Sequence, residues 1–441
     1  MADPLYRFFR TIGRRWETLG QGRLSLGRRP SISGTDLRDE ARDALRRHVI
    51  EPLVPRCIDQ GYGGFVVDFD DKWNAAGPQD KSLEHAARTT RAFALLDEAY
   101  PGSGYDRLVC HGCTFLREAM WDHANGGFYA RVDRSGQPLW EGLKHPHAVT
   151  YAAETFLLAE PHLPPGEGVA WANRALDWLE NVAWDPTHGG YWGSFQRDNQ
   201  RYADGARLPT PDGRDIFGLT SGFKEINTQG DAIEMLTRFE ARHPDRRHAA
   251  RLDGLVDLVA NRLMQPGGVL PYRYLRDWRV SPDLVRVGYQ FLMARHLHGA
   301  VAGRAKPPVV AKVCQMVDFC LKLARHPSGG FCYALTSDGR TWPSSGPSCD
   351  QRQWWVQIEA IYTLHVLASE PTLEPADRAR YLEARDMQWA FFRDVFFDNL
   401  HGGIRKLPIE FAAPLELKTH CWKDPGHEVA AFIALAAGSA D

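Results

Sequence analysis

The chain has 441 residues, 44% of them hydrophobic, so it can bury a large core and is neither a disulfide-dependent miniprotein nor a disordered segment. Lys and Arg number 53 and Asp and Glu 55, which leaves a formal charge of −2 and no basic field to attract nucleic acid. No apolar run approaches the roughly 18 residues of a membrane span, and the N-terminus lacks the apolar segment of a signal peptide.

The cysteines are scattered along the chain. Of the eight, only Cys110 and Cys113 are close in sequence, and no second CxxC completes a structural zinc site. Nothing else in the sequence demands a metal or another cofactor, so we predict none. We expect a cytoplasmic protein, a monomer or homodimer, without nucleic acid or a membrane as partner.

The first segment, residues 1–35, is rich in arginine. Its seven arginines are interleaved with Phe8, Phe9 and Trp16. A basic amphipathic arm of this kind could contact a membrane surface or an acidic partner, or it could wrap around the domain that follows. We predict that this domain, residues 36–441, is a single catalytic domain.

Six Gly-Gly pairs, each followed by a hydrophobic residue, divide the rest of the chain. They recur at intervals of about 62 to 78 residues, which is typical of an internal repeat. Each pair follows a long helical pattern, which glycine can end because it accepts a positive φ. A short β-like stretch comes next, and after Gly127 it has the outline of a hairpin. The pairs are 63–64, 126–127, 189–190, 267–268, 329–330 and 402–403.

Helical spacing of apolar residues predicts two helices in each repeat. Six helical hairpins can stack as an open solenoid or close into a double-ring (α/α)6 barrel. We predict the closed, all-α barrel, because the last helix is apolar and would be a poor terminal cap. The expected helices are 36–58, 82–100, 105–121, 146–160, 168–184, 227–243, 248–264, 287–300, 308–326, 353–370, 375–397 and 427–438.

In such a barrel the inner helices begin at one end, so the residues at their starts converge on one pocket. Carbohydrate sites combine aromatic faces with carboxylates and guanidinium groups, and this mixture predicts a small-molecule carbohydrate as partner. The residues are Glu84, His85 and Arg88; His145 and His147; Asn227, Asp231 and Glu234; Arg286, Tyr289 and Gln290; Arg352, Trp354, Trp355, Gln357 and Glu359; and Trp422, Lys423, Asp424 and His427.

Several of these residues also have ordinary structural interpretations. Trp354 and Trp355 are consecutive, so we expect at most one of them to face the pocket. Glu359 could instead form an ion pair with Arg352.

The acids and histidines also have both a functional and a structural interpretation. Asp231 and Glu234 share a helix face and could be a catalytic acid pair or a solvated edge. His145 and His147 flank a proline, and we expect them at the polar surface. His427 begins the last helix, where the helix dipole favours the neutral imidazole that a general base needs.

Four stretches of the sequence resemble the N-acylglucosamine 2-epimerase superfamily, which includes cellobiose 2-epimerases and mannose-type aldose–ketose isomerases. They are Ala87-Arg88, Asn227-Thr228 with Glu234, Trp354-Trp355-Val356-Gln357-Ile358-Glu359 and Trp422-Lys423-Asp424-Pro425-Gly426-His427.

The resemblance implies an (α/α)6 barrel that acts on a reducing sugar without a redox cofactor. It also implies that Arg88 binds sugar oxygens and that His427 is an acid/base residue at the carbon next to the carbonyl. Removal of a proton from that carbon gives a cis-enediol, and the place where the proton returns decides between epimerisation and isomerisation.

Two positions depart from the family pattern. Asp231 stands where the family carries a histidine, and Tyr289 aligns best with a second one. Unperturbed, a tyrosine with a pKa of about 10 is a poor base and an aspartate with a pKa of about 3.9 a weak one. We therefore predict a sugar epimerase or aldose–ketose isomerase with His427 as base and Tyr289 and Asp231 as proton relays. Its predicted substrate-binding residues are Arg88, Asn227, Glu234, Trp354, Trp355, Glu359 and Trp422.

Two other functions remain open. A glycoside hydrolase or lyase would use Asp231 with Glu234 or Glu359, because glycoside cleavage depends on paired carboxylic acids. A catalytically silent relative would bind a sugar without turnover. In the epimerase or isomerase hypothesis, the insertion at about residues 191–226 is expected to form a lid or rim that selects substrate length.

Overall fold

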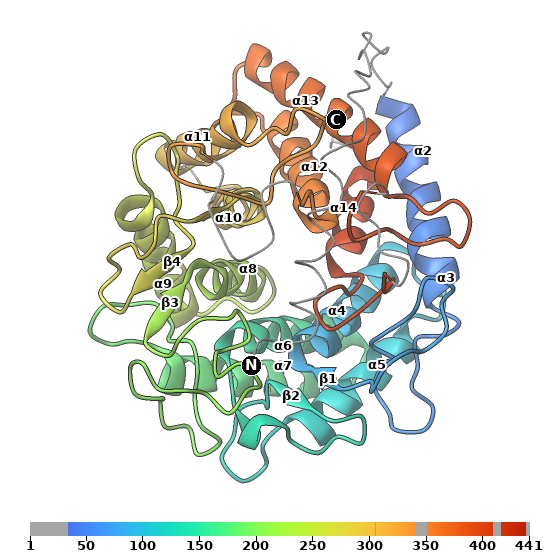
Figure 1. The fold of residues 1–441 in the computed structure, drawn as a ribbon, viewed down its shortest axis with the longest axis vertical. Coiled ribbons are helices and arrows are strands. Elements are labelled where there is room, and N and C mark those ends of the chain that lie inside the picture. Colours follow the sequence, from blue (N-terminus) through green and yellow to red (C-terminus); the bar gives the residue numbers. More distant parts are fainter. Residues whose placement is uncertain (1–33, 305, 341–350, 409–415, 438–441) are drawn as a thin grey trace, which may run out of the picture. The chain divides into compact units, whose positions relative to one another are not determined.

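The computed structural model describes residues 34–304, 306–340, 351–408 and 416–437, all within one compact unit, Ser33–Asp441. Its long helices form two concentric rings (Figure 1). The inner ring consists of α4 (Leu83–Ala99), α6 (Pro146–Ala159), α8 (Ile226–Arg242), α10 (Val287–Val301), α12 (Trp354–Ala368) and α14 (Gly426–Ala437). The outer ring consists of α2 (Gly34–Leu45), α5 (Asp106–Phe115), α7 (Glu167–Trp178), α9 (Arg246–Asp257), α11 (Pro307–Leu323) and α13 (Pro375–Phe396).

All twelve predicted helices are present, with ends displaced by a few residues. The first predicted helix, 36–58, corresponds to α2, a π-helical turn at Arg46–Ile50 and the short α3, Glu51–Leu53. The predicted arm, residues 1–35, lies outside the described residues except for Gly34 and Thr35, which begin α2.

The rings close, as the apolar character of the last helix predicted. Each inner helix packs against the next, and α14 packs against both α2 and α4. Inner helices are buried on most sides because neighbours surround them, and α6 buries every one of its residues. The fold is therefore the expected (α/α)6 barrel.

The expectation that the Gly-Gly pairs end the outer helices is wrong. Each outer helical segment ends a few residues before its pair, as at Met120 before Gly126, and the pairs form turns in the loops that follow. Both glycines of all six pairs have positive φ. At the second glycine the chain also passes close to a neighbouring segment, a side chain in five pairs and the backbone of Gln315 at Gly268. A Cβ on Gly127 would lie 2.4 Å from Nε1 of Trp178, so glycine is needed there for space as well as for conformation.

Buried lysines stabilise four of these glycine turns by hydrogen bonds and ion pairs. Each Nζ donates to the carbonyl of the first glycine of the pair and forms an ion pair with an aspartate just before it. A buried ammonium group needs such a full set of partners. The pairs are Lys81 with Asp59, Lys144 with Asp122, Lys224 with Asp185, and Lys418 with Asp398.

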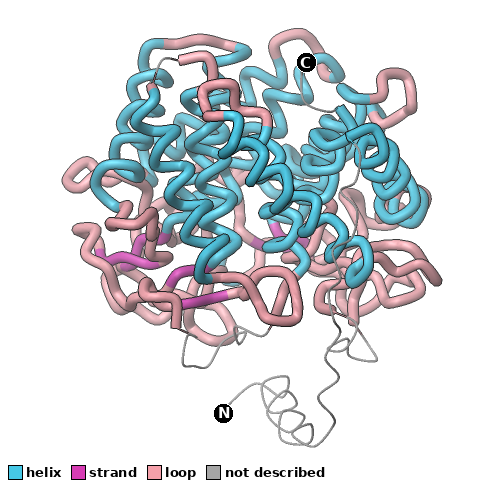
Figure 2. The backbone as a smooth tube through the Cα atoms, turned by 90° about the horizontal axis from the view of Figure 1, so that it is seen from above, coloured by secondary structure: helices cyan, strands magenta, loops and turns pink. Residues whose placement is uncertain are grey.

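Short antiparallel ladders join neighbouring repeats at one end of the helices, where Figure 2 shows the strands gathered. A bridge between Phe69 and Thr419 joins the last repeat to the first, so the loop layer closes as the helices do. This layer holds the starts of the inner helices in place. The strand pairs are β1 (Lys81–Ser82) with β2 (Arg131–Val132), β3 (Phe223–Glu225) with β4 (Arg273–Leu275), and β5 (Val285–Arg286) with β6 (Ala334–Leu335).

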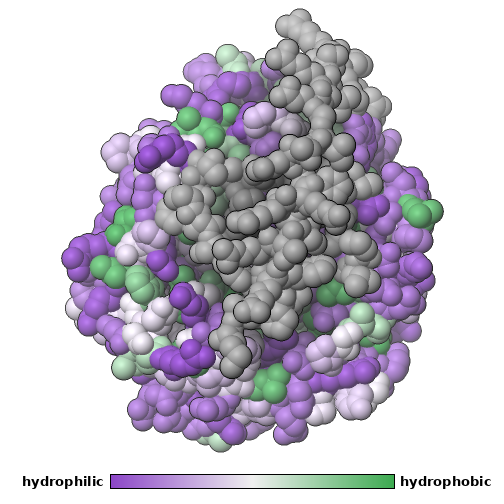
Figure 3. All heavy atoms as spheres, in the orientation of Figure 1, coloured by the Kyte–Doolittle hydropathy of each residue, from purple (hydrophilic) through white to green (hydrophobic). Residues whose placement is uncertain are grey.

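The face seen in Figure 3 is mostly hydrophilic where residues are described, with hydrophobic side chains scattered among polar ones. Isolated exposed apolar residues such as Leu400 and Met387 are normal for a folded protein. Among the described helices, none is long and apolar enough to cross a membrane.

Candidate active site

A cavity of about 260 Å³ lies where the inner helices begin. Helices α4, α6, α10, α12 and α14 all contribute side chains to it, together with the loops that precede them. The lining residues are Glu84, Arg88, His147, Tyr151, Ile216, Phe217, Arg286, Tyr289, Leu292, Tyr333, Gln353, Trp354, Trp355, Lys406, His420, Trp422 and His427.

His427, the second residue of α14, lines this cavity next to a buried carboxylate. Its Nδ1 lies 2.6 Å from Oε1 of Glu359. Burial alone would raise the pKa of Glu359, but Arg295 and His427 more than offset this and lower it to about 2. An ionised carboxylate can only accept, so Nδ1 of His427 carries the proton and donates it. In the neutral ring Nε2 then has a free lone pair.

Trp355 fixes the plane of the His427 ring. The two rings stack with centroids 5.8 Å apart and an interplanar angle of 28°. The indole Nε1 donates to Oε1 of Gln353 over 2.9 Å. Trp355 also packs directly on α10, where a Cβ on Gly288 would lie 2.1 Å from its ring, so only glycine fits there.

Tyr289 follows Gly288 and packs against the same indole, with ring centroids 4.9 Å apart. Burial raises the pKa of its phenol well above the ordinary value, although Arg286 opposes the shift. The hydroxyl therefore stays protonated at neutral pH and can donate a hydrogen bond, but it cannot act as a base.

His147, the second residue of α6, lines the cavity between two carboxylates. Its Nε2 lies 3.2 Å from Oε1 of Glu84, and its Nδ1 lies 2.9 Å from Oδ2 of Asp231. Burial lowers the pKa of this ring, but the two carboxylates outweigh burial and raise it to about 10. His147 is therefore an imidazolium cation at neutral pH.

The expectation that His145 and His147 lie at the polar surface is wrong. Both are buried, with 0% and 3% of their surface exposed. Pro146 begins α6 directly, and the side chain of His145 caps that helix by accepting from the backbone N–H of His147. The pair therefore belongs to the start of an inner helix and not to a surface loop.

Arg88 on α4 is held by two carboxylates at the edge of the cavity. Its Nη1 donates to Glu84 over 3.1 Å, and its Nε lies 3.2 Å from Asp424. The guanidinium group also lies 5.3 Å from the ring centroid of Tyr151. Its orientation is therefore fixed before any ligand arrives.

The three residues predicted on α8 lie behind the cavity and do not line it. Asp231 is covered by His147. Glu234 accepts from Arg91 over 2.9 Å and from Arg295 over 3.2 Å. Asn227 is 2% exposed, and its amide makes no hydrogen bond with any described residue.

One expectation about α12 is wrong, and one alternative that the sequence left open is not realised. Trp354 and Trp355 begin the helix and both line the cavity, although at most one of them was expected to face it. Arg352 donates to the carbonyls of Ser328 and Gly329 and is not the partner of Glu359. Glu359 pairs with Arg295 and His427 instead.

The long insertion reaches the cavity as predicted for a rim. Ile216 and Phe217 line it, and the Phe217 ring lies 4.6 Å from that of His147 and 5.7 Å from that of Trp422. Trp422 is 37% exposed at the opening.

The family model described as N-acylglucosamine 2-epimerase matches residues 63–207 and 217–407. The chain belongs to the N-acylglucosamine 2-epimerase family. Members of this family are carbohydrate epimerases and isomerases. No curated protein matches the chain.

Solved structures of similar fold include sugar epimerases, a sugar isomerase and a glycoside hydrolase. The cellobiose 2-epimerase from Bacillus thermoamylovorans is 18% identical, covers 91% of this chain and 99% of its own, and has a TM-score of 0.79. A D-mannose isomerase is 19% identical, covers 93% of this chain and 100% of its own, and has a TM-score of 0.77. A GH76 α-mannanase from Bacteroides thetaiotaomicron is 9% identical, covers 92% and 96%, and has a TM-score of 0.60.

One cluster in this family member has the composition of a metal site. Ligand atoms of Asp231, Glu234 and His296 lie within 4.8 Å of one another. However, Glu234 already accepts from two arginines, which hold its pKa well below the ordinary value although burial opposes this. Two guanidinium groups beside the same carboxylate would repel a metal cation, so the cluster is better explained as an ion-pair network.

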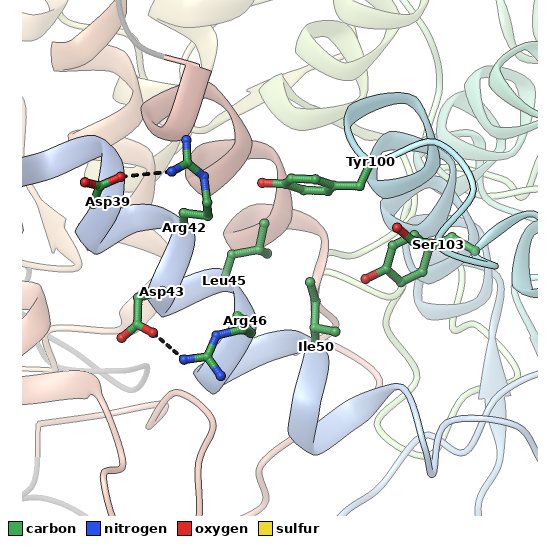
Figure 4. A pocket seen from close by; sticks show the side chains of 9 residues that line it. Asp39, Arg42, Asp43, Leu45, Arg46, Ile50, Tyr100 and Ser103 are labelled. Carbon is green, nitrogen blue, oxygen red and sulfur yellow. Dashed lines mark hydrogen bonds and ion pairs between the residues drawn. The ribbon is translucent and has the colours of Figure 1, made fainter. Parts of the chain in front are cut away.

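A larger hollow of about 440 Å³ lies between α2 and the segment that joins α4 to α5 (Figure 4). Its charged side chains pair with each other along one helix, Asp39 with Arg42 and Asp43 with Arg46. Exposed pairs of this type contribute little free energy and perturb no reactive group. The smaller cavity at the helix starts is therefore the candidate active site of this epimerase-family chain.

Several lining residues were missed from the sequence. Tyr151 could have been found, because it lies one helical turn after His147 on the same face. Tyr333, Lys406 and His420 lie in loops, and no periodic pattern marks which loop side chains point inward. Their common signal is their position shortly after a Gly-Gly pair or shortly before an inner helix.

Proposed function

We propose that this chain is a carbohydrate isomerase that moves a proton at the carbon next to the carbonyl of a reducing sugar, through a cis-enediol. The pairing of His427 with Glu359 carries this proposal. It supplies an imidazole whose Nδ1 proton is held by an ionised carboxylate and whose Nε2 is free at the cavity. This is the arrangement that a general base requires.

In the proposed reaction, Nε2 of His427 takes the proton from C2 of the open-chain aldose. The electron pair of the C–H bond forms the C1=C2 double bond, and O1 receives a proton. The C2 hydroxyl then gives up its proton, the carbonyl forms at C2, and His427 returns its proton to C1. The product is the ketose isomer of the substrate, so no oxidant or reductant is consumed.

Charge that develops on the sugar oxygens needs fixed positive partners. His147 is a buried cation at the cavity wall, and Arg88 presents a guanidinium group that is already oriented. Preorganised charges of this type stabilise an enediolate without having to rearrange. Tyr289 is suited to relay a proton between O1 and O2, and Asp231 acts indirectly by holding the charge on His147.

The different protonation states of His427, His147 and Tyr289 favour isomerisation over epimerisation. Direct epimerisation needs a second base on the opposite face of the carbon. Tyr289 stays protonated and His147 is already charged, so neither can take up a proton. With His427 as the one base, return of the proton to C1 is the simpler outcome.

The remaining predicted residues divide into two groups. Trp354, Trp355 and Trp422 line the cavity and offer faces for a sugar ring. Asn227, Glu234 and Glu359 stand behind the lining and support it. The cavity volume of about 260 Å³ is just below the usual range of roughly 300–1,000 Å³ for drug-sized ligands, which favours a monosaccharide.

The glycosidase alternative is less well supported. It needs a protonated carboxylic acid at the cavity. Asp231, Glu234 and Glu359 do not line the cavity, and the pKa values of Glu234 and Glu359 are lowered, so neither can donate a proton. Likeness of fold to a GH76 α-mannanase does not supply the missing acid.

Proton NMR in heavy water tests the proposal. The enzyme is incubated with free hexoses, N-acylhexosamines and β-linked disaccharides, and the proton next to the carbonyl is followed. We expect deuterium exchange at C2 together with a new ketose. Binding without exchange across the panel would support the silent relative, and cleavage of a glycoside without exchange would support the hydrolase.

A further inference from the structure

The cavity carries more positive than negative charge. Among the lining residues that the structure describes, Glu84 is the one carboxylate, whereas Arg88, Arg286 and Lys406 are cations. His147 adds a fourth positive charge, because its two carboxylate neighbours keep it protonated. A site built for a neutral sugar has no need of this excess.

Two of the four cations are neutralised by the protein itself. Arg88 pairs with Glu84 and Asp424, and His147 contacts Glu84 and Asp231. These three carboxylates are therefore shared by two cations. None of them contacts Arg286 or Lys406.

Arg286 is a half-buried cation without a carboxylate partner among the described residues. Its guanidinium carbon lies 3.9 Å from the ring centroid of Tyr272 and 5.8 Å from that of Tyr333. Aromatic faces hold a guanidinium group in place but do not cancel its charge. The group therefore stays available to an anion in the cavity.

Lys406 is also unpaired within the described part of the chain. Its backbone carbonyl accepts from Trp354, but its Nζ forms no hydrogen bond or ion pair there. The carboxylate of Glu416 is near, although it accepts from the backbone of Leu407 and makes no ion pair with Lys406. Burial lowers the pKa of Lys406, which indicates a desolvated ammonium group.

His420 adds an unused donor next to this lysine. Its Nδ1 accepts from the backbone N–H of Trp422 over 3.2 Å, so in the neutral ring the proton is on Nε2. That Nε2 is buried and has no hydrogen-bond partner in the described ranges. Burial together with the nearby charges of Lys406 and Lys423 lowers the pKa of His420, so the ring is neutral. A buried donor at a cavity wall without a partner is costly until a ligand accepts from it.

We infer that the sugar bound by this cavity carries an acidic group, a phosphate or a carboxylate, which Arg286 and Lys406 attract and to which His420 can donate. Turnover of such a sugar rests on the proposed isomerase function, whereas binding of the acidic group does not depend on it. C1 and C2 take part in the reaction, so the acidic group is on a carbon further along the chain. Hexose 6-phosphates and hexuronates are the two sources of such a group.

The first experiment compares matched sugars with the same enzyme. Glucose, glucose 6-phosphate and glucuronate are assayed side by side, as are mannose and mannose 6-phosphate, and kcat/KM is measured by NMR. We expect kcat/KM for one acidic sugar to be at least tenfold higher than kcat/KM for its neutral parent. Comparison of the 6-phosphates with glucuronate shows whether the bound group is a phosphate or a carboxylate. Equal or faster turnover of the neutral parents would overturn the inference and leave the proposed function standing.

Binding is measured separately from turnover, so that failure of the proposed reaction does not hide the result. Calorimetric titration of His427→Asn uses the same sugars. If no sugar is turned over by the natural enzyme, at least tenfold tighter binding of an acidic sugar still supports the inference, and equal binding of acidic and neutral sugars contradicts it.

Two substitutions identify the residues. Arg286→Gln and Lys406→Met should each raise the KM for the acidic sugar roughly tenfold or more, because a charge-assisted contact is lost. The kcat/KM for the neutral parent should fall several-fold less than the kcat/KM for the acidic sugar, because the neutral parent offers no charge to the lost group. Arg247→Gln and Lys322→Met remove the same charges from exposed helix positions and serve as controls. Equal losses for acidic and neutral sugars would assign Arg286 and Lys406 a structural role and contradict the inference.

Discussion

His147 and His427 occupy the same place in different repeats. Each is the second residue of an inner helix, one after Pro146 on α6 and the other after Gly426 on α14, and both line the same cavity. Their surroundings differ in charge. His147 lies between two carboxylates, whereas Glu359 is the one carboxylate that pairs with His427 among the described residues, and its charge is shared with Arg295.

The difference shows how neighbouring charges assign roles to identical side chains. A helix N-terminus disfavours an imidazolium ion, and burial disfavours it further. Two carboxylates overcome both effects at His147 and make it a permanent cation. At His427 the single, shared carboxylate orients the ring and leaves one nitrogen free. The barrel thus places a fixed charge and a candidate base at one cavity.

Removal of the proposed base should have the largest effect. His427→Asn is expected to lower kcat for C2 exchange by about 10³-fold or more, because an asparagine amide cannot take up the C2 proton as the imidazole Nε2 does. Exchange of the C2 proton is measured by NMR, and sugar binding is measured by calorimetry. Binding should be retained within a few-fold. An asparagine variant with normal exchange would remove His427 from the mechanism.

Loss of the carboxylate behind His427 should have the next largest effect. Glu359→Gln is expected to lower kcat by about 10²-fold, because the amide no longer fixes the Nδ1 proton and leaves Arg295 without that partner. The matched control is Glu370→Gln, whose carboxylate lies 2.6 Å from Nε2 of His298, away from the cavity. Equal kcat values for the two variants would mean that the pairing of Glu359 with His427 is structural.

The charge on His147 predicts a dependence of stability on pH. The pKa of this ring is raised in the folded chain, so its contribution to stability is complete below the unfolded value of about 6.5 and is lost as pH rises toward 10. Asp231→Asn removes one of the two carboxylates, lowers the pKa of His147 and should flatten this decline. Thermal denaturation between pH 6.5 and 10 measures the difference.

The Asp231→Asn variant should also lose about tenfold in kcat at pH 8, because a smaller fraction of His147 is then charged. Parallel Tm curves for both proteins would show that His147 carries no such charge.

The sequence was sufficient for the fold because its signals repeat. The spacing of the Gly-Gly pairs and the apolar character of helix 427–438 predicted the closed barrel, and the starts of the inner helices predicted most of the cavity. His147 was misplaced because its two carboxylates lie on other helices, 63 and 84 residues away, and no local pattern connects them. The same limit applies to α8, where Asp231 was predicted at the pocket but lies behind His147. Local sequence fixes where a helix starts, while the charge around a side chain depends on neighbours from distant repeats.

Substitution of a residue at the rim of the cavity should change turnover least, and it is the last test of the comparison between His147 and His427. Phe217 covers His147 with its ring 4.6 Å away and has no contact with His427 among the described ring pairs. Phe217→Ala is therefore expected to raise KM about three- to fivefold by removing apolar contact area from the sugar, with kcat nearly unchanged. Leu400→Ala, at a residue that is 81% exposed, is the control for loss of an apolar side chain. If kcat fell instead and KM stayed constant, Phe217 would act on catalysis through the environment of His147. The fixed charge would then matter for the chemical step, and the rim would be more than a boundary of the site.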